Sequence, residues 1–152
     1  MSSQTALFAS VVLALAGADL LQVWSFLSAF LLTDTLPDTA LFAVAFWIWF
    51  VTAIAAACCG LRGGYTLVRR GAIRTWTLTT FAGMSCLVFK VGPTELGYSA
   101  IRLGLNFGVP DFRIGVNVLG IGLLWWLQTL RRSAPVQAVD AERQLAQGRG
   151  AV

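Results

Sequence analysis

Asp19 is the residue whose type and position have the clearest chemical meaning, because it lies within a long apolar run. The run, FASVVLALAGADLLQVWSFLSAFLL, contains no other charged residue. A carboxylate at the centre of a membrane helix costs about 2.5–3.5 kcal/mol, and such residues often mark proton or ion pathways. Gln22 follows at a spacing that places it on the same helix face. Asp19 is therefore a candidate proton or cation site, or else a static carboxyl that is ion-paired or kept neutral.

Two further polar residues are predicted at the depth of Asp19. Counted along the helices expected here, Asp19, Lys90 and Asn117 each lie about 20 Å from the same boundary, at 1.5 Å per residue. Asp19 and Lys90 could pair there, with Gln22 and Asn117 satisfying the remaining hydrogen-bonding groups, or Lys90 could extend its ammonium group to the interface. The pattern predicts a layer of four candidate ion-site or proton-site residues: Asp19, Gln22, Lys90 and Asn117.

The cysteines suggest packing rather than metal binding. Cys58 and Cys59 are adjacent, and two thiolates suit a soft metal ion. However, neighbours on a helix point about 100° apart, and cysteine packs well as a small apolar residue. Cys86 would lie about 12 Å deeper in the membrane by the same helical count. Cys58 and Cys59 are therefore weak metal candidates, and we expect no metal.

Several classes of function are made improbable by what the sequence lacks. The chain has no histidine, which removes the commonest metal ligand and the commonest general base. No nucleophile–base pair is recognisable, so we expect neither an enzyme nor a bound cofactor. The net charge of +4 does not indicate nucleic acid, because the arginines lie beside apolar segments and no aromatic platform accompanies them.

Composition places the chain in a bilayer, and hydrophobic segments divide it. Of the 152 residues, 57% are hydrophobic and 12% charged, about half the charged share of a typical soluble domain. We expect an all-α, polytopic protein whose transmembrane domain, residues 1–132, is a four-helix bundle. The spans predicted from length and hydropathy are residues 6–33, 40–61, 75–91 and 112–130.

Two segments are predicted to lie outside the bilayer core. Residues 94–111 are too polar to span, and they form a short interfacial helix, a re-entrant turn or a loop. Residues 133–152 are polar and small, and they are expected to be a flexible cytoplasmic tail.

Charge predicts the orientation. Most of the eleven basic residues fall in the second loop and after the fourth span. By the positive-inside rule both termini are then cytoplasmic. Lys90 is the only lysine, and this arginine bias suggests a GC-rich bacterium and an inner membrane. The topology-setting residues are Arg62, Arg69, Arg70, Arg74, Arg131 and Arg132.

Two functions fit these features. The first is a non-catalytic subunit or assembly factor of a larger membrane complex. Small residues four apart, such as Ala53 with Ala57 and Ala56 with Gly60, favour close helix packing. The second is a small homo-oligomeric transporter or channel that uses Asp19. The expected partners are the lipid bilayer and other membrane subunits or further copies of this chain.

Overall fold

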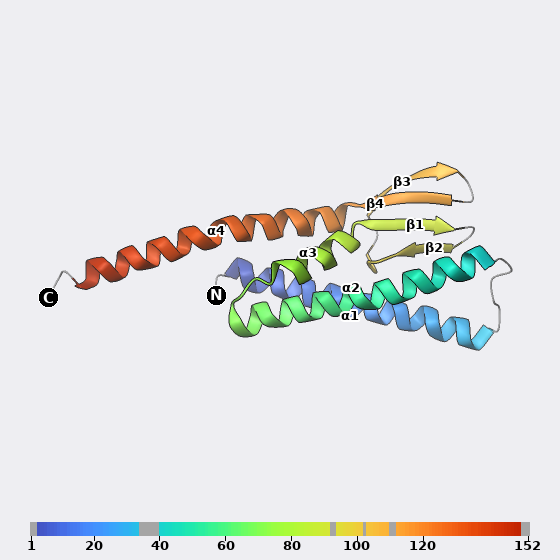
Figure 1. Ribbon diagram of the computed structural model, residues 1–152, viewed down its shortest axis with the longest axis horizontal. Coiled ribbons are helices and arrows are strands. Elements are labelled where there is room, and N and C mark those ends of the chain that lie inside the picture. Colours follow the sequence, from blue (N-terminus) through green and yellow to red (C-terminus); the bar gives the residue numbers. More distant parts are fainter. Residues whose placement is uncertain (1–2, 34–39, 92–93, 102, 110–111, 150–152) are drawn as a thin grey trace.

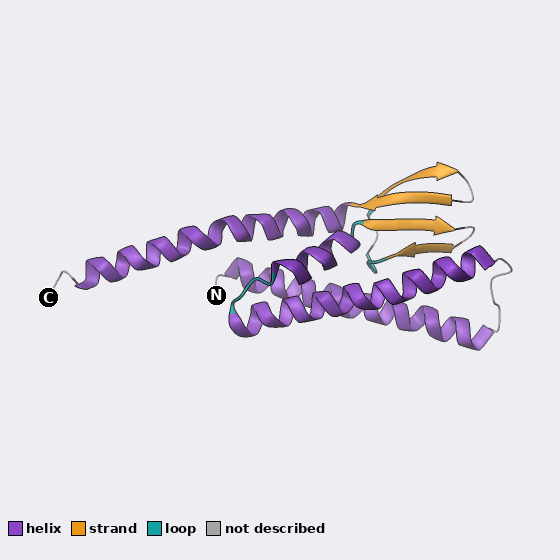
Figure 2. Cartoon of the chain, viewed as in Figure 1, coloured by secondary structure: helices purple, strands orange, loops and turns teal. Residues whose placement is uncertain are grey.

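Helices and a β-sheet share this molecule. The computed structural model describes residues 3–33, 40–91, 94–101, 103–109 and 112–149. Four helices and a four-stranded antiparallel sheet make up that part of the chain (Figure 2). In chain order the elements are α1 (Ser3–Thr33), α2 (Ala40–Arg70), α3 (Thr75–Met84), β1 (Leu87–Val91), β2 (Thr94–Gly97), β3 (Gly104–Val109), β4 (Phe112–Asn117) and α4 (Val118–Arg149).

The predicted all-α bundle of four membrane helices is therefore wrong. Two helices of the described chain are long and apolar enough to cross a membrane, over Ser3–Ala29 and Ala43–Arg70. The span expected over 75–91 ends as a helix at Met84, and the one over 112–130 begins as strand β4. Residues 94–111 contain β2 and β3 rather than an interfacial helix.

The sheet consists of two hairpins joined through their inner strands. Its strand order is β2-β1-β4-β3. In each hairpin the register leaves a two-residue connection, with Val91 opposite Thr94 and Val109 opposite Phe112. Strand β1 follows α3 after a two-residue turn, Ser85–Cys86, and β4 leads directly into α4 (Figure 1). The two central strands, β1 and β4, are therefore the ones joined to α3 and α4.

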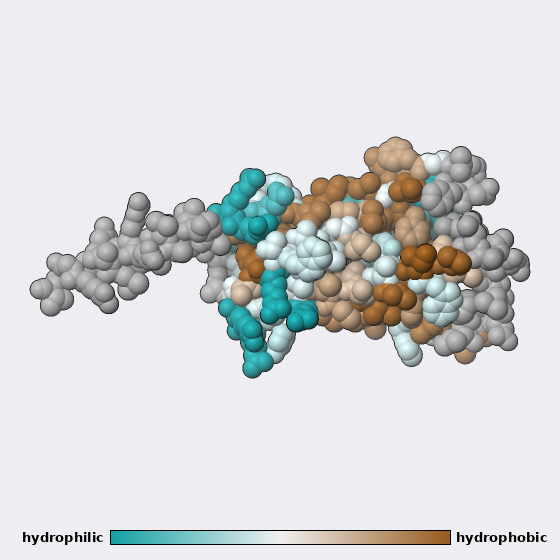
Figure 3. All heavy atoms as spheres, viewed as in Figure 1, coloured by the Kyte–Doolittle hydropathy of each residue, from teal (hydrophilic) through white to brown (hydrophobic). Residues whose placement is uncertain are grey.

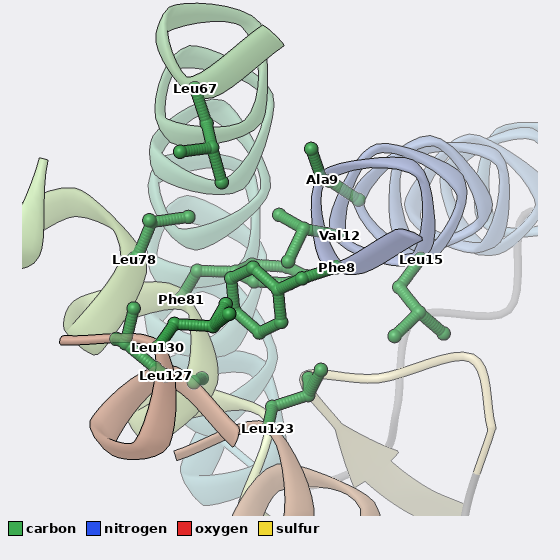
Figure 4. Packing of buried hydrophobic residues seen from close by; sticks show 12 residues of the cluster. Phe8, Ala9, Val12, Leu15, Leu67, Leu78, Phe81, Leu123, Leu127 and Leu130 are labelled. Carbon is green, nitrogen blue, oxygen red and sulfur yellow. The ribbon is translucent and has the colours of Figure 1, made fainter. Parts of the chain in front are cut away.

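A first hydrophobic core joins all four helices. It contains Phe8, Val12 and Leu15 of α1 and Leu67 of α2. Side chains from α3 and α4 point toward them (Figure 4), among them Leu78, Phe81, Leu123, Leu127 and Leu130. Burying each large aliphatic or aromatic side chain contributes roughly 1.5–3 kcal/mol in water.

A second core joins the sheet to the other half of the α1–α2 pair. Val23 of α1 and Trp49 of α2 pack there with Leu96 and Tyr98, at the end of β2 and just beyond it. Asp19 lies in sequence between the α1 residues of the first core and those of the second. The α1–α2 pair thus carries the α3–α4 helices at one end and the sheet at the other (Figure 1).

The helix α2 is longer than expected. It covers most of the predicted second loop and ends where Gly71, at φ 62°, donates its amide to the Leu67 carbonyl at 3.0 Å. Glycine adopts that left-handed conformation without steric cost. Small residues do allow close packing on this helix. A Cβ added at Gly60 would lie 2.9 Å from Cβ of Ala16.

Hydrophilic side chains gather toward one end of the helical body (Figure 3), and six exposed arginines belong to the helices and the connection there. These are the residues predicted to set topology: Arg62, Arg69, Arg70, Arg74, Arg131 and Arg132. Beyond them α4 continues as a helix to Arg149, through most of the predicted tail. The mobility of that tail stays a prediction.

Candidate functional site

Asp19 binds the loop between β2 and β3. Its side chain is 4% exposed, and Oδ1 accepts a hydrogen bond of 2.7 Å from the backbone amide of Ala100. The second oxygen, Oδ2, is buried and has no hydrogen-bond partner in the described part of the chain. An unsatisfied buried acceptor costs about 1–3 kcal/mol, and more if it is charged. The free oxygen can hold a proton or accept one further hydrogen bond.

Asn117 binds the same loop from the end of the sheet. It is fully buried, and its Oδ1 accepts hydrogen bonds from the amides of Leu103 (3.1 Å) and Leu119 (3.2 Å). Its Nδ2 donates to the Ile101 carbonyl at 2.9 Å. The bond to Leu119 also caps the first turn of α4, which is the usual role of asparagine at that position. The three hydrogen bonds of the Asn117 side chain therefore all join backbone groups of the loop and of α4.

The helix α2 binds the beginning of the loop. The Trp49 indole is buried and donates to the Gly97 carbonyl at 2.8 Å, and the hydroxyls of Thr52 and Tyr98 share a hydrogen bond of 3.0 Å. Two helices and the sheet therefore hold the backbone between Gly97 and Leu103. This backbone, rather than a second helix, is what Asp19 faces.

The structure places the other candidate residues differently. Lys90 lies in β1, opposite Glu95 of β2 and Arg113 of β4 in the register. Gln22 is half-buried, one turn beyond Asp19. Asp19 and Asn117 are linked through adjacent residues of one loop, Ala100 and Ile101. The expected ion pair between Asp19 and Lys90 is not among the contacts of the described residues, and an ion site made by these four residues stays a prediction.

The three cysteines differ in exposure and in the elements on which they lie. Cys58 is exposed and Cys59 half-buried on α2. Cys86 lies in the turn between α3 and β1, where its thiol donates to the Ala82 carbonyl at 3.3 Å. Burial raises the pKa of the Cys86 thiol above its ordinary value. Within the described residues no three side chains of His, Cys, Asp or Glu are grouped as a metal site.

One face of the sheet is apolar, and the sequence interpretation missed it. Leu96 and Phe89 on this face pack against the core made with α1 and α2, whereas others on β1, β3 and β4 are exposed. Cross-strand partners share a face, and the register puts five exposed apolar side chains on one side. They are Leu87, Leu105, Phe107, Ile114 and Val116. The alternation of apolar residues in GLNFGV and FRIGVN, with Pro110-Asp111 between them, is the signal that would have predicted this hairpin.

The two edges of the sheet differ. The outer strand β2 lies beside α2. There the Trp49 indole donates to the Gly97 carbonyl, and the hydroxyls of Thr52 and Tyr98 share a hydrogen bond. The outer strand β3 pairs with β4 alone in the described chain, and Gly104–Val109 contains neither a charge nor a proline. Proteins usually protect a free edge with such residues.

Comparison with protein-family models, with curated proteins and with solved structures finds no match to this chain. Its function must therefore be inferred from the geometry above.

Proposed function

We propose that this chain is an integral membrane protein held in the bilayer by α1 and α2. Both helices pass the length and hydropathy requirements for a span. Only 39% of the most apolar stretch of α1, and 33% of that of α2, is buried within the molecule. A core helix of a soluble protein would be mostly covered, whereas lipid accepts such exposed apolar surface. We place the arginine-rich end in the cytoplasm of a bacterium, at the inner membrane.

We further propose that it acts as a non-catalytic subunit or assembly factor of a larger membrane complex. The observation that supports this is the apolar face of the sheet beside the unprotected edge of β3. In water, the exposed apolar face would be unfavourable. In lipid, the unpaired N–H and C=O groups of the edge would be unfavourable, since lipid offers them no partner. In either surrounding, another polypeptide stabilises the sheet.

Purification in mild detergent tests this role. Leu105 in β3 and Leu21 in α1 are 70% and 69% exposed, which makes them a matched pair. We expect Leu105→Ser to lose the polypeptides, or further copies of this chain, that bind the native protein, and Leu21→Ser to retain them. Equal retention by both variants, or a native protein that purifies as a single chain alone, would refute the proposal.

Asp19 supports a second candidate function, a small homo-oligomeric proton-coupled or ion-coupled transporter. Its Oδ2 is buried without a partner in the described chain, beside the loop whose Ala100 amide donates to Oδ1. The Asp19→Asn variant keeps an acceptor for Ala100 but cannot carry the charge. Transport predicts that this variant inserts and assembles normally and yet loses flux across vesicles. Unchanged flux would leave Asp19 with a structural role.

A further inference from the structure

The edge of β3 has the properties of a strand that pairs with another strand. Its partner on the inner side is β4, over the full register from Gly104–Asn117 to Val109–Phe112. Its outer side carries unpaired backbone groups at every second residue, as any edge strand does. The opposite edge of the sheet is held against α2 through Trp49 and Thr52. Pairing along β3 would therefore supply hydrogen-bond partners to the edge that has no such contact among the described residues.

We propose that two copies of this chain pair through β3, antiparallel, about a two-fold axis that passes between residue 106 of one copy and residue 106 of the other. This rests on the membrane location proposed above and identifies a second copy as the polypeptide that stabilises the sheet. The product is one continuous sheet of eight strands. Such an interface is isologous, since the same strand serves on both sides.

The face of the sheet restricts the register. A two-fold axis between antiparallel strands runs perpendicular to the sheet, so it keeps the apolar face of both copies on one side. Opposite residues must then belong to the same face. With the axis at residue 106, Leu105 lies opposite Phe107 of the partner subunit, and Gly104 lies opposite Gly108 of the partner subunit. A register shifted by one residue would place apolar residues opposite those of the other face.

This register extends the apolar face without interruption. One row runs from Leu87 through Val116 to Leu105 in the first copy. It then continues through Phe107, Ile114 and Phe89 of the partner subunit, and the symmetry produces a second, identical row in the opposite direction. Each row consists of apolar side chains, which lipid accepts once the backbone beneath them is fully hydrogen-bonded.

Charge and size also favour self-pairing. The strand Gly104–Val109 is uncharged, so its antiparallel copy brings no like charges opposite each other. On β4, Arg113 lies opposite Gly108, and in the dimer the next residue in that row is the partner's Gly104. The largest side chains of β3 thus meet each other on one face, and two glycines leave room at each end of the interface.

Cysteine cross-linking in membranes tests the pairing and its register. The background is the full chain with Cys58, Cys59 and Cys86 replaced by alanine. Asn106→Cys should form a disulfide-linked dimer, because opposite residues of an antiparallel pair have Cα atoms about 4.5–5.5 Å apart, within disulfide range. Leu105→Cys alone should not cross-link, since its own copy would lie about 8 Å away. Leu105→Cys expressed with Phe107→Cys should cross-link to it.

The control is Leu21→Cys, which is as exposed as residue 105 but lies on α1. Cross-linking of Asn106→Cys no greater than that of this control would overturn the proposal, and self-linking at residue 105 or 107 instead would overturn the register. Native mass spectrometry of the unsubstituted protein avoids any folding defect of the variants. It should show two copies of the 16.3 kDa chain. A single copy bound to other polypeptides would refute this pairing and leave the proposed subunit role intact.

Discussion

At the scale of single residues, two buried polar side chains bind the same loop, but they differ in how many of their polar atoms are hydrogen-bonded. Asn117 satisfies its oxygen twice and its amide once, whereas Asp19 satisfies one oxygen of two. A fully bonded buried group stabilises a fold, while a partly bonded one is costly and is retained where it has another use. Asp19 is therefore the residue at which stability and function can be separated by substitution.

The first prediction concerns how much each of these hydrogen bonds contributes to stability. Asp19→Leu leaves the Ala100 amide without its acceptor and should lower the free energy of unfolding by about 1–3 kcal/mol. Asp19→Asn keeps an acceptor and should leave that free energy almost unchanged. Asn117→Leu removes three hydrogen bonds and should destabilise more than Asp19→Leu does. Denaturant titration in detergent measures all three, and equal losses for Asp19→Leu and Asp19→Asn would contradict this assignment.

The second prediction uses two glycines on one helix. A Cβ added at Gly120 would collide with the Cys86 backbone, whereas one added at Gly122 meets nothing within 4 Å. Alanine should therefore stabilise α4 at position 122 by up to about 1 kcal/mol, through helix propensity. At position 120 the collision outweighs that gain, and Gly120→Ala should lower the melting temperature. If both variants melt alike, α4 does not lie against the turn between α3 and β1.

At the scale of elements, the sequence predicted α1 and α2 well and the sheet not at all. The first two apolar segments are long, and their length favours a helix over a strand. Residues 87–117 are short apolar runs that suit a strand or a buried helix equally, and length is what decides between them. The alternation in β3 and β4 and the two-residue connections were the available signals. The packing of Leu96 against Trp49 is a long-range contact that no local pattern indicates.

The candidate site was predicted in part for the same reason. Asp19 and Asn117 were expected to be polar groups within the bilayer, and both are buried. Their common neighbour, the loop after β2, could not be foreseen, because a helix was expected to face them. The loop binds the two buried side chains through its backbone groups. Every residue type carries these groups, so the sequence does not indicate which residues will supply them.

The third prediction concerns the turn between α3 and β1. Burial raises the pKa of the Cys86 thiol, and the thiolate is the reactive form. A variant with Cys86 as its only cysteine should therefore be alkylated more slowly than in its unfolded state. Its rate should also continue to rise with pH above 9.0, the ordinary value for this group. The same protein in denaturant is the control, and identical pH profiles in the two states would contradict the burial of this turn.

At the scale of the whole molecule, six exposed arginines lie toward one end. The exposed arginines of α2, the α2–α3 connection and α4 lie at the end where the chain also begins (Figure 1). The apolar body and the sheet lie on the other side of them (Figure 3). If the bilayer surrounds that body, the arginines contact the lipid headgroups on one side.

The fourth prediction tests the proposed orientation. Single cysteines at Arg69 and at Asp38, the latter outside the described residues, should react with a membrane-impermeant reagent from opposite sides. Arg69→Cys should be protected in intact cells and Asp38→Cys labelled. The reverse pattern would invert the orientation, and labelling of both from outside would show that α2 does not cross.

The distance in sequence between Asp19 and its partner has a consequence for synthesis. The two residues are 81 positions apart, and a ribosome adds about 5–20 residues per second, so roughly 4–16 s separate their appearance. Throughout that interval α1 exists without the amide that its carboxylate binds. The loop in turn is held by Asn117, which is made later still. Asp19 therefore lacks the loop that binds and covers it until the last strand of the sheet, which ends at Asn117, has been made.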